Sequence, residues 1–485
     1  MATRNANIGK SVDWFTIVLY AILVVCGWFS ICGASYDFTN HDFFSFATRP
    51  GKQLVWIGCA TLLGIVLLNI EKKYYELLAY PVYVAFIVLL VVTIFIAPDT
   101  KGSHSWLVFG PVKVQPAEFA KFATALALGK LMSSYNYSIG KRSDFIKTLA
   151  IIVLPMLLIV AQSETGSALV YLAFFLVLYR EGMTGSLLLV GVCAVVFFVL
   201  GISLGGKTFT DMPVDTGMFV VLLLVPLITA LMLSIYAHDG RRAAVVLLSA
   251  LGATLAAYLT SRFFVPFNIC IVQIIVCVLI FLYLLIVYAV ERMPRYVLIG
   301  IFALGSVGYY YSCDYVFNNV LEDYQQARIR VTLGVDVDDK GVGYNVNQSK
   351  IAIGSGGLFG KGFLKGTQTK LDYVPEQATD FIFCTIGEEK GFVGSVAVLL
   401  LFGAFILRLL VLAERQGTNR FARIYGYSIV CILTLHLLIN IGMVLGLTPV
   451  IGIPLPFFSY GGSSLWGFTI MIAIFLRMDA ERSVR

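Results

Sequence analysis

Residues 265–290 read VPFNICIVQIIVCVLIFLYLLIVYAV and contain no Asp, Glu, Lys or Arg. A helix of this length can cross about 30 Å of hydrocarbon, because each residue adds about 1.5 Å to its axis. Comparable apolar runs recur along the chain, and they predict an all-α polytopic membrane protein with about fourteen transmembrane helices. The runs lie near residues 13–34, 51–70, 74–97, 115–133, 145–162, 166–181, 185–205, 217–237, 243–261, 265–290, 296–316, 381–412, 421–447 and 459–478.

The composition fits this class, since 59% of the 485 residues are hydrophobic and only 13% are charged. The net charge is +7. Loop lysines and arginines that fix topology explain that excess better than a polyanion-binding surface, so we expect a membrane and no nucleic acid as partner. The nine cysteines are scattered singly, so neither a disulfide framework nor a metal site is expected.

The charges of the loops predict how the chain is oriented in the membrane. The N-terminal segment lacks the small-residue cleavage site of a signal peptide, so the first helix is expected to stay as an anchor. With the N-terminus in the cytoplasm, the short loops on that side are all basic, as the positive-inside rule requires. This orientation places the loop around Trp106 and the long polar segment 317–380 together on the extracytoplasmic face.

The segment 317–380 ends in Asp380, directly before the apolar run 381–412. A carboxylate at the mouth of a membrane helix is costly to keep, which makes Asp380 the best-placed candidate for chemistry. The same position also suits a helix N-cap, in which the carboxylate accepts hydrogen bonds from the first helical amides. From the residues alone, the two interpretations are about equally favoured.

Glycines are frequent between residues 354 and 366, where they alternate with short apolar steps. Such spacing most often turns the chain within a tightly folded loop that has re-entrant or interfacial helices. A phosphate cradle is the sharper alternative, because backbone amides and the side chains of Lys361, Lys365 and Lys370 would together meet a diphosphate. The absence of a Walker or GxGxxG pattern favours the turning role.

Several blocks of sequence resemble one bacterial membrane family. The blocks are WLVFGPVKVQPAEFAKFATAL (106–126), NQSKIAIGSGGLFGKGFLKGTQ (347–368), PEQATDFIF (375–383), IGEEKGFVG (386–394) and NIGMVLGLTPVIGIPLPFFSYGGSS (440–464). In this order they resemble the SEDS family, the RodA, FtsW and SpoVE proteins of shape, elongation, division and sporulation. The resemblance covers about residues 10–205 and 296–480. The family core has ten helices, so about four helices near residues 185–290 are expected to be inserted.

The resemblance implies a peptidoglycan glycosyltransferase that polymerises lipid II on the outer face of the bacterial cytoplasmic membrane. The implied partner is a class B penicillin-binding transpeptidase. Asp380 occupies the family's proposed catalytic position, so we expect it to be the general base that deprotonates the acceptor hydroxyl, with inversion at the anomeric carbon of the donor. The segment GIPLPFF (452–458) is more similar to RodA than to FtsW, which favours cell elongation over cell division.

The chain departs from the family pattern at several positions. Ser105 stands where the family usually has an arginine before the loop tryptophan, and Glu164 replaces the aspartate of the family's QPDLGTA motif. Ala378 replaces the common histidine two residues before the acid. The last change argues against a histidine beside Asp380 in this chain.

Charged pairs in the apolar runs are further candidates. Glu118 and Lys121 lie three residues apart on one helix face, where a structural ion pair is slightly favoured over substrate contact. Glu388, Glu389 and Lys390 interrupt the run after Asp380, and a charge cluster at that depth is expected to face a cavity or a partner.

Other residues are expected to bind or support the substrate. Trp106 would either stack on a sugar or lie in the interfacial aromatic belt. The leaving diphosphate needs positive charge, and a divalent cation could share that work, although no ligand set with metal spacing is present. The candidates for that charge are Lys361, Lys365, Lys370, Arg328 and Arg330, and the remaining supporting candidates are Gln348, Ser349 and Ser459.

Two other classes of function stay open. One is a transporter of lipid-linked precursors, in which Glu118 and Lys121 would form a relay; its typical size fits, but no Gly- or Pro-broken helices recur at matching positions in two halves. The other is a scaffold that only docks the transpeptidase and would tolerate changes at Asp380. Within the family, an FtsW-like division polymerase is the alternative.

Overall fold

The computed structural model describes residues 11–36, 42–100, 102–110, 112–205, 214–321, 326, 329–330, 342–371 and 373–482. Its contacts divide the chain into two units: unit 1 comprises residues 1–183 and 344–485, and unit 2 comprises residues 184–343. Each unit has a hydrophobic core of its own. Of the residues expected to supply positive charge, Arg328 lies outside the described residues.

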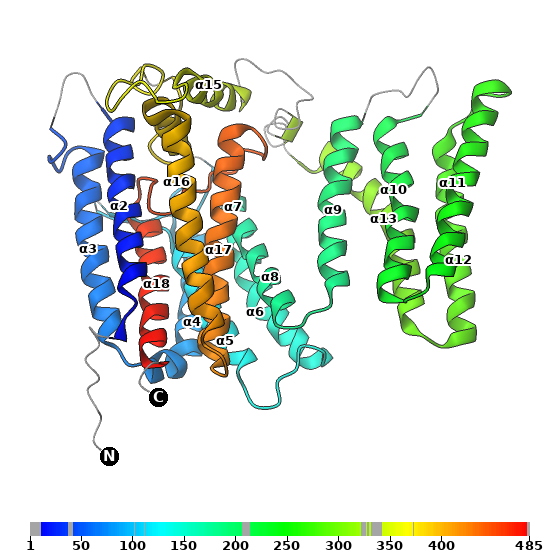
Figure 1. Cartoon of the computed structure of the whole chain (residues 1–485), viewed down its shortest axis with the longest axis horizontal. Helices are drawn as coiled ribbons and strands as arrows, with labels where there is room; N and C mark the ends of the chain where they lie inside the picture. The colour runs from blue at the N-terminus through cyan, green and yellow to red at the C-terminus, as the bar shows by residue number, and fades with distance from the viewer. Residues whose placement is uncertain are drawn as a thin grey trace. The chain divides into compact units, whose positions relative to one another are not determined.

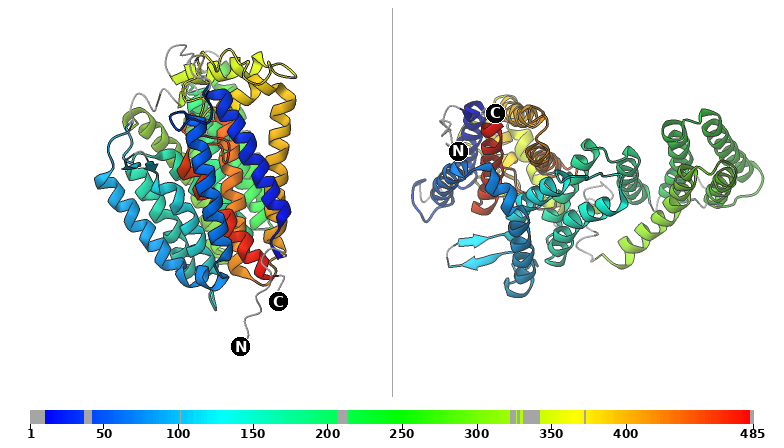
Figure 2. Two further views of the ribbon diagram at one scale, coloured as in Figure 1. Left: turned by 90° about the vertical axis from the view of Figure 1, so that its left-hand side faces the viewer. Right: turned by 90° about the horizontal axis from the view of Figure 1, so that it is seen from below.

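Unit 1 is a bundle of long helices that run alongside one another, with the shorter helix α15 across one end (Figures 1 and 2). A two-stranded antiparallel hairpin precedes α5, formed by β1 (Leu107–Phe109) and β2 (Val112–Val114). The helices are α2 (Trp14–Ala34), α3 (Arg49–Asn69), α4 (Lys72–Ile96), α5 (Pro116–Met132), α6 (Arg142–Ala161), α7 (Thr165–Leu169), the 3₁₀ turn η1 (Val170–Leu172), α8 (Ala173–Arg180), α15 (Val342–Ser355), α16 (Ile382–Glu414), α17 (Arg420–Leu445) and α18 (Gly462–Arg482).

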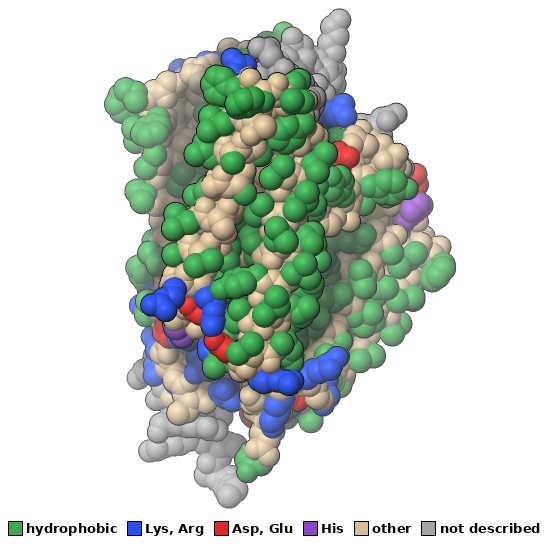
Figure 3. Space-filling model, turned by 90° about the vertical axis from the view of Figure 1, so that its right-hand side faces the viewer, with side chains coloured by type: hydrophobic (Ala, Val, Ile, Leu, Met, Phe, Trp, Pro, Cys, Tyr) green, Lys and Arg blue, Asp and Glu red, His purple; other side chains and the backbone are tan. Residues whose placement is uncertain are grey.

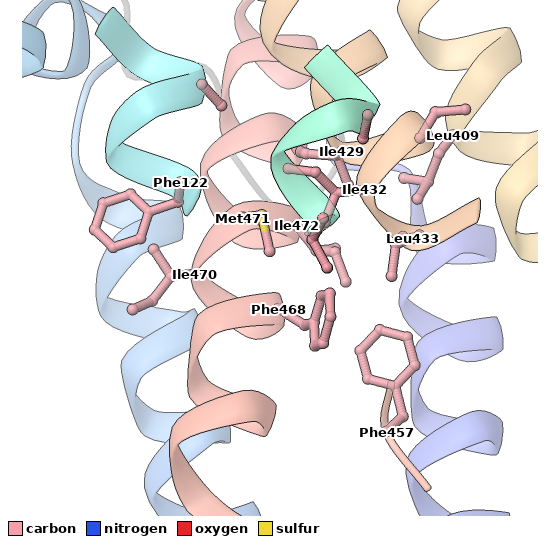
Figure 4. Close-up of a cluster of buried hydrophobic side chains, with 14 of the residues drawn as sticks. Phe122, Leu409, Ile429, Ile432, Leu433, Phe457, Phe468, Ile470, Met471 and Ile472 are labelled. Atoms are coloured by element: carbon pink, nitrogen blue, oxygen red, sulfur yellow. The ribbon is translucent and has the colours of Figure 1, made fainter. Parts of the chain in front are cut away.

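Helix α18 is the most enclosed helix of those long and apolar enough to span a membrane, since 89% of its most apolar window is buried, against 17% for α3. Figure 4 shows its side chains Phe468 and Met471 among those of the neighbouring helices and of Phe457, from the loop that joins α17 to α18. The rings of Phe457 and Phe468 lie 5.7 Å apart. The α17–α18 loop (residues 446–461) is therefore packed against the centre of unit 1.

The described part of unit 2 contains five long helices: α9 (Gly185–Leu204), α10 (Thr216–Tyr236), α11 (Gly240–Phe263), α12 (Ile269–Glu291) and α13 (Pro294–Asn319). The face that carries α11 and α12 is covered by hydrophobic side chains over its middle, and Lys and Arg side chains collect toward one end (Figure 3). On α11 the exposed apolar residues include Val245, Leu248, Leu255 and Leu259. This distribution is expected of helices that contact lipid.

Twelve helices in the described part of the chain are long and apolar enough to cross a membrane. Helix α5 and the apolar stretch Thr165–Arg180 account for the two other predicted runs. All fourteen apolar runs are therefore helical, and the predicted fold class, an all-α polytopic membrane protein, is confirmed.

Helix α16 is 33 residues long and is broken at Gly391, where φ is +66°. Residues 354–366, here called the glycine loop, pack against this break backbone to backbone. The amides of Phe392 and Val393 donate hydrogen bonds to the carbonyls of residues 357 and 358, at 2.9 and 3.0 Å. A Cβ on Gly391 would lie 2.3 Å from the amide nitrogen of Gly360. Glycine is needed here because a side chain would keep the two backbones apart.

Candidate active site

Asp380 lies half-buried in the turn before α16, and its backbone is held by two other segments. The carbonyls of residues 378–380 each accept one hydrogen bond. The donors are the Tyr460 amide at 2.8 Å, the Ser459 hydroxyl at 2.6 Å and the side-chain amide of Asn440 at 2.9 Å. The backbone that carries the carboxylate is therefore fixed at three successive peptide units.

The α17–α18 loop lies directly beside the carboxylate. Gly452 has φ of +74°, and a Cβ at this position would lie 3.4 Å from Oδ2 of Asp380. Asn440 donates a second hydrogen bond to the carbonyl of Ile453, at 2.7 Å. One side-chain amide thus joins the Asp380 turn to the α17–α18 loop.

Glu118 and Lys121 form a buried ion pair on α5, as the sequence predicted. Lys121 Nζ lies 2.7 Å from Glu118 Oε1 and 3.0 Å from Nε2 of His436 on α17. Nδ1 of His436 lies 3.3 Å from the carbonyl oxygen of Pro454. Because a carbonyl can only accept, a neutral His436 donates from Nδ1 and accepts from the ammonium at Nε2. The hydrogen-bonded chain therefore runs from Glu118 through Lys121 and His436 to the α17–α18 loop.

The sequence interpretation missed His436 and Asn440. They are four residues apart on α17, so they lie on one face of the helix, and both are buried. The available signal was the pair of polar side chains in the apolar run 421–447, because polar groups inside a membrane helix are costly and mark functional or structural sites.

Trp106 is half-buried at the start of the β1–β2 hairpin. The residue before it, Ser105, is buried, and its hydroxyl donates to Oε2 of Glu164 at 3.0 Å. Ser103 donates to the same oxygen at 2.9 Å. Ser105 and Glu164, which both depart from the family pattern, are thus in direct contact. A neutral hydroxyl and a longer acidic side chain meet where the family pattern has arginine and aspartate.

The hairpin and Asp380 share one end of unit 1. Gly166, two residues after Glu164, packs against the α17–α18 loop, because its Cβ would lie 2.6 Å from the carbonyl of Ile451. The amide of Gln115 donates to Ser463 at the start of α18, at 3.2 Å. The α17–α18 loop therefore contacts Gly166, which follows Glu164 closely in the chain, and it also contacts the turn that carries Asp380.

Glu388 is fully buried and organises the glycine loop and the residues after it. One of its oxygens accepts from Lys361 Nζ and from the amide of Thr367, each at 2.7 Å, and the other accepts from the amide of Thr369 at 3.0 Å. Glu389 accepts from the amide of Leu364 at 3.0 Å. The positive charge of Lys361 is therefore already matched within the protein, and the two glutamates are structural acceptors for this loop.

The other expected cations differ in their surroundings. Lys365 is exposed. Lys370 Nζ lies 3.9 Å from the ring centroid of Tyr36, and burial lowers the pKa of its ammonium, an effect partly offset by Glu389. Arg330 lies in unit 2, over the ring of Phe317.

The remaining candidates support the backbone. Ser349 on α15 is buried, and its hydroxyl lies 2.7 Å from the carbonyl of Val444 on α17, so it joins the two helices. Gln348 is half-buried on α15. Ser459 accepts from the amide of Leu455 at 2.8 Å besides donating to the Asp380 turn. Among the described residues, no group of three or more His, Cys, Asp or Glu is arranged to hold a metal ion.

Comparisons with known proteins agree on one family. A model of the cell cycle proteins FtsW, RodA and SpoVE matches residues 12–208 and 264–484. The peptidoglycan glycosyltransferase RodA of Treponema pallidum is 31% identical over 436 residues, which are 89% of this chain and 89% of that protein.

Two solved structures have a similar fold. One is a peptidoglycan synthase complex described as coordinating polymerization and crosslinking, with a TM-score of 0.60, 22% identity and coverage of 97% of this chain and 98% of that chain. The other is the rod shape determining protein RodA of Thermus thermophilus, with a TM-score of 0.54, 21% identity and coverage of 97% of each chain.

Proposed function

The chain belongs to the FtsW, RodA and SpoVE family of cell cycle proteins, and from this membership we propose that it is a peptidoglycan glycosyltransferase of the RodA type. The observation that carries the proposal is the half-buried residue Asp380, whose backbone is held by hydrogen bonds at three successive peptide units. The similarity to RodA extends over most of the chain, whereas the relatives named FtsW match at 26% over comparable lengths or at higher identity over about a third of the chain.

Asp380 is the general base. Glycan polymerisation requires that a sugar hydroxyl of the acceptor lose its proton as its oxygen attacks the anomeric carbon of a lipid-linked donor. A carboxylate whose backbone is fixed can keep its oxygen within hydrogen-bond reach of that hydroxyl. The bond from the anomeric carbon to the diphosphate breaks as the new glycosidic bond forms, and attack from the opposite face inverts the anomeric centre.

The buried chain from Glu118 to Pro454 positions the site. It reaches the α17–α18 loop through His436, and the same loop contacts the carboxylate at Gly452. Lys121 and Glu118 are therefore positioning residues, which act on the site through His436 and the α17–α18 loop. This account agrees with the structural ion pair that the sequence favoured.

Lys365, which is exposed, and Lys370, which is half-buried over the Tyr36 ring, are the candidate cations for the leaving diphosphate, and Lys361 is paired with Glu388. The exposed ammonium of Lys365 can move to an anion at little cost, because no ion pair within the described residues holds it. Trp106, which is half-buried at the start of the hairpin, stacks on a sugar of the substrate in this proposal.

The substrate is lipid II, and the site lies on the extracytoplasmic side of the cytoplasmic membrane. Support for the side comes from the basic loops of the opposite face. It also comes from contacts near the start of α18, where Tyr460 bonds to the turn before Asp380 and Ser463 bonds to Gln115 after the Trp106 hairpin. A class B penicillin-binding transpeptidase is the partner, in line with the similarity to a peptidoglycan synthase complex. Cell elongation is the process in which the RodA type acts.

We further propose that the family core, residues 10–205 and 296–480, carries inserted helices near residues 185–290. The stretch between the two matched ranges, 209–263, holds α10 and α11, whereas α9 and α12 lie within the matched ranges.

The decisive experiment supplies lipid II to vesicles that contain the purified protein and its class B transpeptidase. Glycan length is followed on a gel, and movement of labelled lipid II across the membrane is followed in the same vesicles. Glycan formation by wild type without faster lipid movement is the expected result. Faster lipid movement without glycan would show a transporter instead. A folded complex that gave neither glycan nor faster lipid movement would be a scaffold.

A further inference from the structure

An exposed apolar patch lies in unit 1 beside the break in α16 and near the C-terminal end of α2. Leu358 and Phe359 of the glycine loop are 65% and 81% exposed, and Phe392 and Val393 on α16 are exposed beside them. The four residues are held together by backbone hydrogen bonds from 392 and 393 to 357 and 358. Because the glycines bring the backbones into contact, the loop cannot withdraw its apolar side chains without breaking this pairing.

The patch continues along the face of α16 that has no protein cover. Val393, Leu400, Leu407 and Val411 are all exposed, at spacings of seven, seven and four residues. These spacings place them on one face of the helix, and the stretch from 393 to 411 is long enough to cross most of the hydrocarbon layer. The face is therefore turned to lipid, and Leu358 and Phe359 extend it at the end nearest the break in α16.

A second contact fixes the depth of the loop. The ring of Phe363 lies 5.8 Å from that of Phe29, which is five residues before the end of α2. At about 1.5 Å per residue, the loop reaches roughly 7 Å below the end of this membrane helix. With the end of α2 taken as the surface of the hydrocarbon layer, this contact places Phe363 near the boundary between headgroups and acyl chains.

Positive charge lies at the rim of the patch. Lys365 and Lys390 are both exposed, and Nζ of Lys390 lies 5.1 Å from the ring centroid of Phe363. Lys361 adds nothing here, because it is paired with Glu388. An apolar surface with lysines at its edge matches an anionic phospholipid, whose acyl chains and phosphate meet the two parts.

We propose that the glycine loop is a membrane wedge: Leu358 and Phe359 insert into the leaflet on the side of Asp380, and Lys365 and Lys390 bind the phosphates of anionic phospholipids there. Apart from Lys365, which is also proposed to meet the leaving diphosphate, the residues of the wedge lie outside the proposed catalytic site. It attaches the loop that Glu388 organises to the bilayer surface.

The test uses the full chain in vesicles of equimolar phosphatidylglycerol and phosphatidylcholine, with the photoreactive p-benzoylphenylalanine in place of Phe359. Leu400 serves as the lipid-facing control, and Asn347, an exposed residue of α15, serves as the control outside the patch. After illumination, adducts are identified by mass spectrometry. We expect lipid adducts at 359 in a yield close to that at 400, and none at 347.

The lipid selectivity tests the lysines. Each lysine near an anionic surface favours binding by about fivefold, so the adducts at 359 should be enriched in phosphatidylglycerol, and the K365Q/K390Q variant should lose most of that enrichment. A protein adduct at 359 would assign the patch to a second copy or another chain and overturn the wedge. A yield at 359 as low as at 347, while 400 still gives lipid adducts, would also overturn it.

Discussion

The two units differ in the kind of polar group that they bury. Unit 1 buries Glu118, Lys121, Glu388 and Asp479, among others, whereas the buried polar residues described in unit 2 are uncharged: Thr229, Thr254, Ser261, Gln273 and Ser306. A buried charge must be paired and hydrogen-bonded to be tolerated. Unit 1 therefore carries a cost that unit 2 avoids, and in unit 1 the charged chain leads to the loop beside Asp380. Among the described residues, buried charge is therefore confined to unit 1, although both units are built from membrane helices.

The largest expected effect on stability comes from breaking the ion pair of unit 1. Lys121→Met leaves the Glu118 carboxylate buried without its partner, which should lower the free energy of unfolding by about 3–5 kcal/mol. The matched change in unit 2, Gln273→Leu, removes only a long 3.4 Å hydrogen bond and should cost about 1 kcal/mol or less. Thermal unfolding in detergent measures both.

The double variant Glu118→Gln/Lys121→Met separates charge from packing. It removes both charges, so it should recover much of the stability lost by Lys121→Met. A double variant as unstable as the single one would show that the site depends on the shape of the lysine and not on an unpaired carboxylate.

Asn440→Ala tests the link between α17 and the Asp380 turn. It removes both hydrogen bonds to buried carbonyls, each worth about 1–3 kcal/mol when the acceptor is left unpaired. We expect at least a tenfold lower rate of glycan formation at saturating lipid II from protein that still elutes as a single species. Ser306→Ala, which removes a buried hydroxyl in unit 2, should leave the rate unchanged. Equal rates for wild type and Asn440→Ala would remove Asn440 from the positioning of the base.

A smaller effect is expected at Ser105 and Glu164. The variants Ser105→Ala and Glu164→Gln and their combination form a double-mutant cycle for one hydrogen bond to a carboxylate. We expect a coupling free energy of about 1.5–3 kcal/mol or less in thermal stability, because the acceptor is only half-buried and Ser103 donates to the same oxygen. Additive effects of the two changes would mean that the contact does not stabilise the hairpin.

The smallest expected effect is the dependence of stability on low pH, which comes from Asp13 at the start of α2. Burial raises the pKa of Asp13, but hydrogen bonds from Arg408 and Thr16 outweigh it and lower that pKa to about 2, from an ordinary value of 3.8. The ionised form is therefore favoured by folding. The stabilisation is complete above pH 3.8 and is lost as the pH falls toward 2. Wild type should unfold at a higher temperature than Asp13→Asn at pH 6, and the difference should shrink between pH 4 and pH 2; a constant difference would contradict this.

The sequence was sufficient for the helices and for the pair on α5. Hydrophobic runs long enough to cross a bilayer leave the backbone no alternative to helix, so fourteen runs became helices. Glu118 and Lys121 are local in sequence, and their spacing alone brings them together. The role of the glycines could also be predicted, because few residues other than glycine allow a tight turn or a close approach of two backbones.

Contacts between distant segments could not be predicted in the same way. Asn440 meets Asp380 across 60 residues, and Ser105 meets Glu164 across 59. Nothing in the spacing of these residues indicates that they touch. Similarly, the sequence does not distinguish Lys361 from Lys365. Only the fold shows that Lys361 is paired with Glu388 and that Lys365 is exposed.

The most direct test of the account compares Asp380→Asn with Asp314→Asn in lipid II polymerisation by the purified complex. Asp314 is a stringent control, because it lines a cavity of about 320 Å³ in unit 2 together with Asp215 and Arg330. Loss of the general base should slow glycan formation by about 10²–10⁴-fold in Asp380→Asn, while Asp314→Asn keeps the wild-type rate. Wild-type activity in Asp380→Asn, or an equal loss in Asp314→Asn, would contradict the assignment of the chemistry to unit 1.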